Sequence, residues 1–479
     1  MHDLSIERGP FEPSWESLRG YRCPEWFRDA KLGIWAHWGP QSVPMYGDWY
    51  AQHMYEEGSD QYRYHLRRYG HPSRFGYKDI IALWKAERFE PEALMRLYVD
   101  AGARYFVAQA AHHDNFHNWN SQHHRWNAVA MGPGKDIVGL WRDAARQQGL
   151  RFGLSEHMGA SFSWWVANKG ADVAGAWAGV PYDGNDPEYE DLYLPNRGAK
   201  GWRQEWYTSN PRWHERWFIY AKELVDVYQP DLLYSDGGVP FGEIGLHLIA
   251  HLYNTSARRN AGHNEAVYTQ KDRDPQVFTV GVLDIECSQL PEAMPHVWQT
   301  DSFIGNWFYD VRAVYKTPKH VAEILVDVVS KNGNLLLNIP QRPDGTIDDE
   351  CRYILDCMAA WIAVNGEGIY GTRPWIQAAE GPSQVVIDRF KEEPVAWTIE
   401  DFRFTAKGNT VYAFQMKWPE GGKTVIRSLA LGRTERVSSV TLLGHGAPLP
   451  FEQGGRGLAI DLPEEKPCAY VQCYRIVLG

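Results

Sequence analysis

Several features that define other protein classes are missing from this sequence. Only six of its 479 residues are cysteine, and no two of them form a Cys-x-x-Cys pair. This argues against a zinc knuckle or a dithiol redox site, so we expect six free thiols. The sequence has no extended block of Lys and Arg, and its net charge is −11. Both observations argue against a nucleic-acid partner.

Long apolar runs are also absent. No stretch of about eighteen apolar residues occurs, so we predict no membrane-spanning helix and no membrane partner. The first fifteen residues, MHDLSIERGPFEPSW, contain no apolar core of a signal peptide. We therefore expect a cytoplasmic protein, or a periplasmic or secreted one if a signal peptide has been removed.

The length and the aromatic content are typical of a large folded protein. A chain of 479 residues exceeds one ordinary domain, and its 44% hydrophobic residues can build a sizeable core. It also contains 22 tryptophans. Indole rings fill cores, but they also cover the apolar face of a sugar while their N–H binds a hydroxyl. We expect most of them in the core and a few at a carbohydrate site.

Five apolar stretches share one pattern, because each ends in side chains that can carry a charge. In parallel α/β proteins the carboxyl ends of the strands carry the functional site. One such ending is most simply a strand followed by a polar loop, but five together favour a shared site. The residues at these ends are His37, His112 with His113, Glu156 with His157, Asp236, and Glu286.

Eight predicted strands make a (β/α)8 barrel the simplest fold for the first part of the chain. Helical patterns at residues 91–101, 211–228 and 317–333 separate some of them. The connections between strands five, six and seven are too short for full helices, so we predict an irregular barrel. The predicted strands cover residues 32–38, 104–110, 151–155, 231–235, 267–270, 281–286, 297–301 and 334–340.

The pattern changes after about Gly371. Short alternating strands separated by turn residues, such as RFTAKGNTVYAFQMKW, replace the helices and predict a β-sandwich. We therefore expect an α/β catalytic domain over residues 1–368 and a β-sandwich domain over residues 369–479. The long segment 158–210 is too polar for the core, and we expect it to form part of the wall of the site.

Two of the strand-end carboxylates suit glycoside hydrolysis. Hydrolysis with retention needs two carboxyl groups about 5–5.5 Å apart, one as nucleophile and one as general acid and base. Asp236 is the candidate nucleophile, because the two glycines that follow it leave room for a sugar ring, although Asp-Gly-Gly is also an ordinary turn. Glu286 is the candidate acid/base. Its rivals are Glu156, Asp48 and Asp301.

Histidines at the strand ends could bind either sugar hydroxyls or a metal ion. His112 and His113 are neighbours on a predicted strand, so they should point to opposite faces and cannot easily bind one ion together. The His-x-His pair that is usual in barrel metallohydrolases is missing from the first strand. We therefore expect His37, His112, His113 and His157 to contact a sugar, with no metal and no other cofactor.

With these residues identified, the chain resembles the α-L-fucosidases of glycoside hydrolase family twenty-nine. KLGIWAHWGPQSVPMYGDWY resembles their first-strand signature, and HHDNFHNWNS followed by WNAVAMGPGKDIVGLW resembles their second-strand block. PDLLYSDGG is similar to their nucleophile strand. WQTDSFIGNWFY and DVVSKNGNLLLNIPQRPDGTI are similar to their last two barrel strands. These motifs occur in order over roughly residues 25–375.

The resemblance implies a retaining exo-hydrolase that releases terminal α-L-fucose from a fucosylated oligosaccharide or polysaccharide through a covalent intermediate. It also implies an irregular barrel with a C-terminal β-sandwich. Asp236 matches the family's nucleophile, and Glu286 lies where the acid/base is often found. The expected sugar-binding residues are His37, Asp48, Trp49, His112, His113, His157, Tyr234 and Trp307.

The chain departs from the family pattern at positions that should line the pocket. Asp48 replaces a glutamate, Glu156 and His157 replace part of a Tyr-Tyr-Ser sequence, and Tyr234 replaces a common tryptophan. These changes bear on sugar identity and linkage rather than on reaction type. The alternatives are the same scaffold acting on a related sugar such as an α-L-galactoside, and a non-catalytic carbohydrate-binding protein or metal hydrolase on the same barrel.

Overall fold

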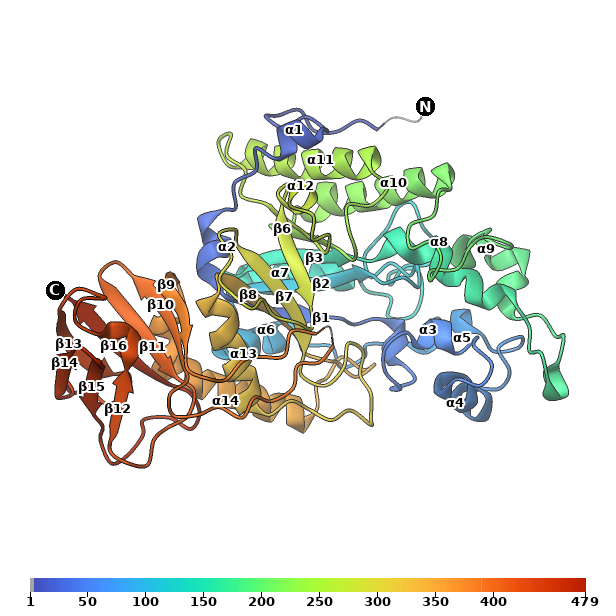
Figure 1. Ribbon diagram of the computed structural model, residues 1–479. Helices are drawn as coiled ribbons and strands as arrows, with labels where there is room; N and C mark the ends of the chain where they lie inside the picture. Colours follow the sequence, from blue (N-terminus) through green and yellow to red (C-terminus); the bar gives the residue numbers. More distant parts are fainter. Residues whose placement is uncertain (1–3, 389) are drawn as a thin grey trace.

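The computed structural model describes residues 4–388 and 390–479 (Figure 1). Eight parallel strands follow one another around a closed barrel, and the last strand pairs with the first. This confirms the predicted fold class. The strands are β1 (Leu32–Ala36), β2 (Tyr105–Ala111), β3 (Arg151–Glu156), β4 (Leu232–Ser235), β5 (Val267–Gln270), β6 (Val282–Glu286), β7 (Trp298–Phe303) and β8 (Gly333–Asn338).

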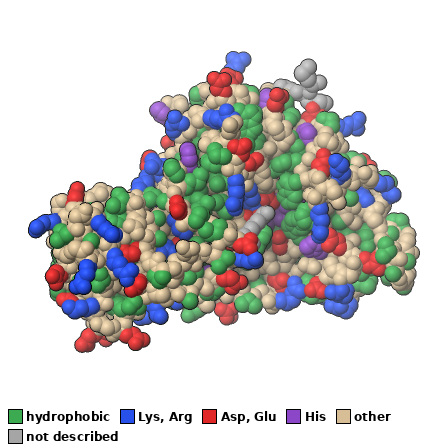
Figure 2. All heavy atoms as spheres, viewed as in Figure 1, with side chains coloured by type: hydrophobic (Ala, Val, Ile, Leu, Met, Phe, Trp, Pro, Cys, Tyr) green, Lys and Arg blue, Asp and Glu red, His purple; other side chains and the backbone are tan. Residues whose placement is uncertain are grey.

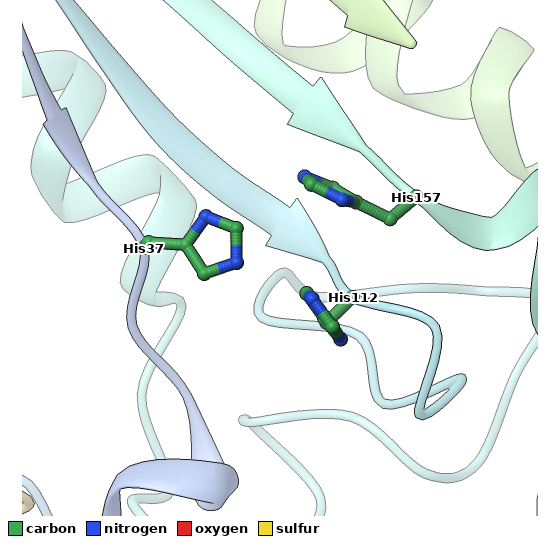
Figure 3. A group of neighbouring side chains, drawn as sticks. All are labelled: His37, His112 and His157. Atoms are coloured by element: carbon green, nitrogen blue, oxygen red, sulfur yellow. The ribbon is translucent and has the colours of Figure 1, made fainter. Parts of the chain in front are cut away.

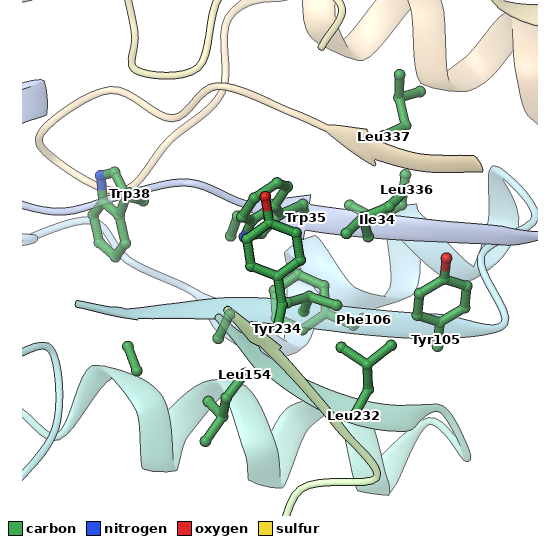
Figure 4. Close-up of a cluster of buried hydrophobic side chains, with 14 of the residues drawn as sticks. Ile34, Trp35, Trp38, Tyr105, Phe106, Leu154, Leu232, Tyr234, Leu336 and Leu337 are labelled. Atoms are coloured by element: carbon green, nitrogen blue, oxygen red, sulfur yellow. The ribbon is translucent and has the colours of Figure 1, made fainter. Parts of the chain in front are cut away.

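The barrel strands are buried along nearly their whole length, which explains their continuous apolar sequences. Figure 4 shows some of the buried apolar side chains on these strands, among them Ile34, Phe106 and Leu232. Gly33 leaves room for the ring of Tyr105, because a Cβ at this position would lie 2.3 Å from Cζ of Tyr105. This packing fixes the backbone, so the residues at the strand ends are held in place.

Helices cover the outside of the barrel but not evenly. Helix α13 shows how the sequence sets a boundary: the side chain of Thr317 accepts a hydrogen bond from His320 N, and Pro318 occupies the first turn. Between β5 and β6 lies only the four-residue helix α12 (Pro275–Phe278), and the described chain between β6 and β7 contains no helix. The predicted irregularity is confirmed. The long helices are α6 (Pro91–Asp100), α7 (Ile137–Gln147), α10 (Pro211–Tyr228), α11 (Glu243–Arg259), α13 (Pro318–Ser330) and α14 (Asp349–Asn365).

Shorter helices fill the connections at the two ends of the barrel. Among the described residues, none of the helices is long and apolar enough to cross a membrane. The short helices before β2 are α1 (Trp15–Leu18), α2 (Glu25–Ala30), η1 (Pro40–Ser42), α3 (Tyr50–His53), α4 (Asp60–Arg68) and α5 (Tyr77–Leu83), and η7 (Gly366–Gly368) follows α14.

The segment 158–210 is more buried than its composition indicated. Trp164, Trp165 and Tyr193 have no exposed surface, so the prediction that this segment is too polar for the core is wrong. Its polar groups are paired inside the protein: Asp183 accepts hydrogen bonds from the hydroxyls of Tyr55 at 2.7 Å and Tyr193 at 2.6 Å. The segment contains η2 (Met158–Ala160), α8 (Ser161–Trp164), η3 (Trp165–Lys169), η4 (Gly175–Trp177), η5 (Asp183–Asn185), η6 (Pro187–Tyr189) and α9 (Glu190–Tyr193).

The C-terminal part of the chain forms two antiparallel sheets around a separate apolar cluster, as predicted. The five-stranded sheet has the order β13-β16-β11-β10-β9, and the three-stranded sheet has the order β12-β15-β14. Strands β9 and β14 were not predicted. The strands are β9 (Arg373–Glu380), β10 (Phe402–Lys407), β11 (Thr410–Gln415), β12 (Lys423–Ile426), β13 (Val437–Leu442), β14 (Phe451–Gly454), β15 (Gly457–Asp461) and β16 (Gln472–Leu478), with η8 (Arg427–Leu429) between β12 and β13.

A buried ion pair joins these sheets to the barrel. Asp327 of α13 contacts Arg403 of β10 at 2.5 Å and Lys331 at 2.6 Å, and all three side chains are at most 3% exposed. Each charge therefore has a partner away from water. All six cysteines are free, as expected.

Candidate active site

A cavity of about 640 Å³ opens at the carboxyl ends of the barrel strands. It brings together every residue that the sequence selected as catalytic or sugar-binding. Those residues are His37, Asp48, Trp49, His112, His113, His157, Tyr234, Asp236, Glu286 and Trp307.

Asp236 follows directly after β4 and lies among three basic side chains. Its Oδ2 is 3.3 Å from His113 Nε2 and 3.4 Å from His157 Nδ1, and its Oδ1 is 2.9 Å from Lys271 Nζ. Burial alone would raise the pKa of Asp236, but Lys271 and the two histidines hold it well below its usual range. Asp236 is therefore ionised at neutral pH, as a carboxylate nucleophile must be.

Lys271 is the main active-site residue that the sequence analysis missed. It follows directly after β5, and its Nζ contacts Glu286 Oε2 at 2.8 Å as well as Asp236. Burial would lower the pKa of Lys271, but the neighbouring carboxylates Asp236, Asp301 and Glu286 raise it well above its usual value. The signal was present, since the predicted strand at residues 267–270 is followed directly by the titratable side chain of Lys271.

Two further carboxyl groups, those of Asp301 and Asp284, lie near Lys271. Asp301 Oδ2 is 3.5 Å from Lys271 Nζ and accepts a hydrogen bond from the Tyr234 hydroxyl at 2.9 Å. Asp284 accepts one from Gln299 Nε2 at 2.6 Å. Burial raises the pKa of Asp301 to about 6, and burial together with Asp301 raises that of Asp284 well above its usual range. Asp284 therefore holds its proton more tightly than an ordinary aspartate, while Asp301 contacts Lys271 directly.

His37, His112 and His157 point toward one another (Figure 3), with one nitrogen of each ring within 4.8 Å of the others. Neither ring nitrogen of His37 has a hydrogen-bond partner among the described residues. Burial holds the pKa of all three histidines below the usual range. The rings are therefore neutral, and each carries one donor nitrogen and one acceptor nitrogen.

The side chain of Gln41 sets the tautomer of His112. Gln41 Oε1 accepts a hydrogen bond from Ala51 N, which orients the amide so that its Nε2 donates to His112 Nδ1 at 2.9 Å. His112 Nε2 therefore carries the proton and presents an N–H to the cavity. An N–H suits a hydroxyl oxygen and not a metal ion, so the expected sugar-binding role fits this ring better than metal ligation.

The prediction that His112 and His113 lie on opposite faces is wrong. Strand β2 ends at Ala111, so the alternation of side chains stops before these residues and both rings line the cavity. The Nδ1–H of His113 donates to the carbonyl oxygen of His157 at 2.7 Å, which turns His113 Nε2 toward Asp236.

Aromatic rings form one wall of the cavity. The ring centroids of Trp49 and Trp202 are 4.8 Å apart, and that of Trp206 is 5.1 Å from His113. Trp307 also lines the cavity, and its ring centroid lies 5.3 Å from that of His37. Trp202 and Trp206 come from the segment 158–210, so its predicted contribution to the wall of the site is confirmed at these residues.

Glu156, the main rival for the acid/base role, does not line the cavity. It is 1% exposed and accepts hydrogen bonds from Trp217 Nε1 at 2.9 Å, Ser235 Oγ at 2.6 Å and Met158 N at 3.1 Å. These bonds satisfy the carboxylate inside the protein and join β3 to β4 and α10. Glu156 therefore supports the strand that carries Asp236.

Comparison with known proteins agrees with this geometry. The family model described as alpha-L-fucosidase matches residues 2–367, and the model for the alpha-L-fucosidase C-terminal domain matches residues 397–477. Human tissue alpha-L-fucosidase is 29% identical over 472 residues, covering 96% of this chain and 89% of the relative. Human plasma alpha-L-fucosidase is 30% identical over 500 residues, covering 96% and 91%.

A solved structure agrees with the same assignment. Thermotoga maritima α-fucosidase in complex with a mechanism-based inhibitor superposes with a TM-score of 0.77 at 27% identity, covering 98% of this chain and all of that one. The two family models together match residues 2–367 and 397–477, and the relatives and the solved structure cover 96–98% of the chain. The protein described here therefore belongs to the α-L-fucosidase family and is a glycoside hydrolase.

Proposed function

We propose that this enzyme releases terminal α-L-fucose from fucosylated oligosaccharides or polysaccharides with retention of configuration. One observation carries the proposal. Because Lys271 Nζ lies 2.9 Å from Asp236 Oδ1 and 2.8 Å from Glu286 Oε2, these two oxygens are at most 5.7 Å apart. Retaining enzymes hold their carboxyl groups about 5–5.5 Å apart, whereas inverting enzymes need about 6.5–9.5 Å.

The first step forms a covalent glycosyl-enzyme. The ionised Asp236 attacks the anomeric carbon from the face opposite the leaving group, and Glu286 gives its proton to the glycosidic oxygen as that bond breaks. The product is a β-linked fucosyl ester on Asp236.

We further propose that residues 1–368 carry this chemistry and that residues 369–479 form the second domain.

The second step releases the sugar. Glu286, now a carboxylate, takes a proton from water, and the water attacks the anomeric carbon from the face that the leaving group vacated. The bond to Asp236 breaks, and α-L-fucose leaves with its original configuration. Two inversions give net retention, and both carboxyl groups return to their starting state.

The neutral imidazoles and the aromatic wall bind the sugar. His37 and His112 present ring nitrogens that can bind ring hydroxyls, and Asp48 adds an acceptor whose pKa burial raises to about 7. Trp49 and Trp307 provide flat surfaces for the apolar face of the sugar. A solved structure of the Thermotoga maritima enzyme, 27% identical over 98% of this chain, contains fucose, which supports fucose as the sugar here.

Glu286→Ala should lower the turnover of an aryl α-L-fucoside by roughly 10²-fold. The covalent intermediate then lacks the base that activates water. Azide needs no such base, so it should restore turnover and give α-fucosyl azide by attack on the intermediate from the leaving-group face. Rate measurements and NMR of the azide product test this assignment. A β-configured product would show that Glu286 is not the acid/base.

Glu156→Gln is the control, because it removes the charge of the rival carboxylate and nearly keeps its size. This variant should keep turnover within about 10-fold of wild type, since Glu156 is not among the residues that line the cavity. Glu156→Ala should instead lower the unfolding free energy by roughly 2–4 kcal/mol, because the Trp217 and Met158 N–H groups lose their buried acceptor. A loss of turnover in Glu156→Gln larger than that in Glu286→Ala would transfer the acid/base role to Glu156.

A further inference from the structure

The chain between β9 and β10 leaves the C-terminal sheets and reaches the mouth of the cavity. Figure 1 shows this orange segment extending toward the barrel strands. Phe390 N donates a hydrogen bond to the carbonyl oxygen of Cys287 at 3.1 Å. Glu392, only 5% exposed, accepts one from Ser302 Oγ at 2.5 Å and contacts Lys316 Nζ at 3.1 Å. These contacts fix the segment on the barrel and place Phe390 in the lining of the cavity.

The position of Phe390 identifies the part of the substrate that it meets. Its backbone is bonded to Cys287, the residue directly after Glu286. A general acid in a glycoside hydrolase lies beside the glycosidic oxygen, so the leaving group occupies the space next to Glu286. Phe390 therefore stands on the leaving-group side of the cavity, outside the volume of the sugar that is cleaved.

Two arginines also line this mouth. Arg273 lies two residues after Lys271, which itself contacts Glu286. Arg203 comes from the segment 158–210 and lies with its guanidinium 4.9 Å from the centroid of the Trp202 ring. The cation–π contact holds this guanidinium against a flat aromatic surface. Phe390 and Trp202 are thus two aromatic residues of this cavity, which Arg203 and Arg273 also line.

In the part of the chain that the structure describes, no carboxylate neutralises the charge of these arginines. Within residues 4–388 and 390–479, neither Arg203 nor Arg273 forms a salt bridge, although the chain has 60 Asp and Glu. The carboxylates deeper in the cavity are occupied by Lys271 and the histidines. Figure 2 shows Lys and Arg side chains around the hollowed centre of this face. A planar guanidinium binds sulfate and carboxylate oxygens through two parallel hydrogen bonds.

We propose that Phe390, Trp202, Arg203 and Arg273 form a subsite for an anionic sugar in the leaving group. The aromatic rings contact the sugar ring, and the guanidiniums bind its negative group. That group is a sulfate ester or the carboxylate of a uronic acid, which present similar oxygen geometry. This inference rests on the proposed function, because it concerns the group that the fucosidase reaction releases.

The test compares three α-L-fucosyl disaccharides of one linkage that differ only in the second sugar. The second sugar is neutral galactose, its sulfate ester, or galacturonate, and an aryl α-L-fucoside serves as the reference substrate. At least one acidic disaccharide should have a kcat/KM about 10-fold or more above that of the neutral one. This ratio should fall toward one as salt is raised from about 0.05 to 0.5 M.

Variants connect the preference to the named residues. Arg203→Gln and Arg273→Gln should each reduce the acidic-to-neutral ratio by at least about 3-fold, and together they should bring it to about one. Phe390→Ala should raise KM for all three disaccharides relative to the aryl fucoside. Arg433→Gln, an exposed arginine of the C-terminal sheets, is the matched control and should keep the wild-type ratio.

The outcomes separate this inference from the proposed function. Failure to hydrolyse the aryl fucoside would contradict the proposed function itself. Hydrolysis of that substrate with equal kcat/KM for acidic and neutral disaccharides would overturn the subsite. A preference that survives in the double arginine variant would overturn it as well. A preference for the sulfate ester alone, or for the uronate alone, supports the subsite and identifies its anion.

Discussion

Asp236→Gly should reduce the turnover of an aryl α-L-fucoside by at least about 10⁴-fold. The side chain lines the cavity, and Lys271, His113 and His157 keep it ionised, so it is the group prepared to attack the anomeric carbon. Its removal leaves no carboxylate on that face of the sugar. Initial rates with substrate above and below KM measure the loss. Circular dichroism and thermal unfolding confirm that the variant is folded.

Azide gives the same variant a chemical signature. With Asp236 replaced by glycine, azide can enter the vacated space and displace the aryl group directly, with Glu286 still in place. One inversion then gives β-fucosyl azide, whereas Glu286→Ala should give the α anomer. NMR coupling constants distinguish the two products. An α product from Asp236→Gly, or turnover within about 10-fold of wild type, would assign the nucleophile to another residue.

The sequence predicted the barrel and most of the pocket for one physical reason. In a parallel barrel every strand ends at the same edge, so titratable residues directly after apolar runs must meet. His37, Asp236 and Glu286 were found in this way, and all three line the cavity. The rule does not depend on side-chain rotamers or on loop structure, so it holds without knowledge of either.

Other features could not be derived in this way. Phe390 reaches the cavity through a backbone bond to Cys287, more than one hundred residues earlier in the chain, and no local pattern encodes that contact. The directions in which the His112 and His113 side chains point depend on where β2 ends, and it ends at Ala111. Strand ends are the least certain part of a sequence-based prediction. The structural role of Glu156 could not be predicted either, because it rests on a hydrogen bond from Trp217, which belongs to a helix far along the chain.

The charges at the base of the cavity form one connected system. Lys271 contacts the candidate nucleophile, the candidate acid/base and Asp301, while Asp301 in turn helps burial to raise the pKa of Asp284. A single buried ammonium therefore balances several carboxyl groups. Its loss would leave like charges close together in a region of low dielectric, where their repulsion is strong. Lys271 is thus expected to affect both the ionisation of the site and its stability.

Lys271→Met should shift the acidic limb of the pH dependence of kcat/KM to higher pH, by about 1–3 units. The reaction needs ionised Asp236, and Lys271 is the largest influence that lowers the pKa of this carboxyl against burial. Without the ammonium, burial raises that pKa, so protonation removes the nucleophile at a higher pH. At pH 7 we expect kcat/KM to fall by roughly 10³-fold, because both reacting carboxyl groups also lose a positioning contact. Rates from pH 4 to 9 measure the profile.

Lys271→Arg is the control, since it keeps a positive charge while changing its shape. It should retain an acidic limb close to that of wild type, even where its altered geometry lowers kcat.

The stability of Lys271→Met provides an independent measurement. Asp236 has a lowered pKa in the folded state, so it stabilises the fold above its unfolded pKa, and this contribution disappears as pH falls through the folded value. Lys271→Met should reduce this contribution and lower the unfolding free energy at pH 7 by about 3–5 kcal/mol. An unchanged acidic limb in a folded Lys271→Met variant would show that the histidines alone keep Asp236 ionised.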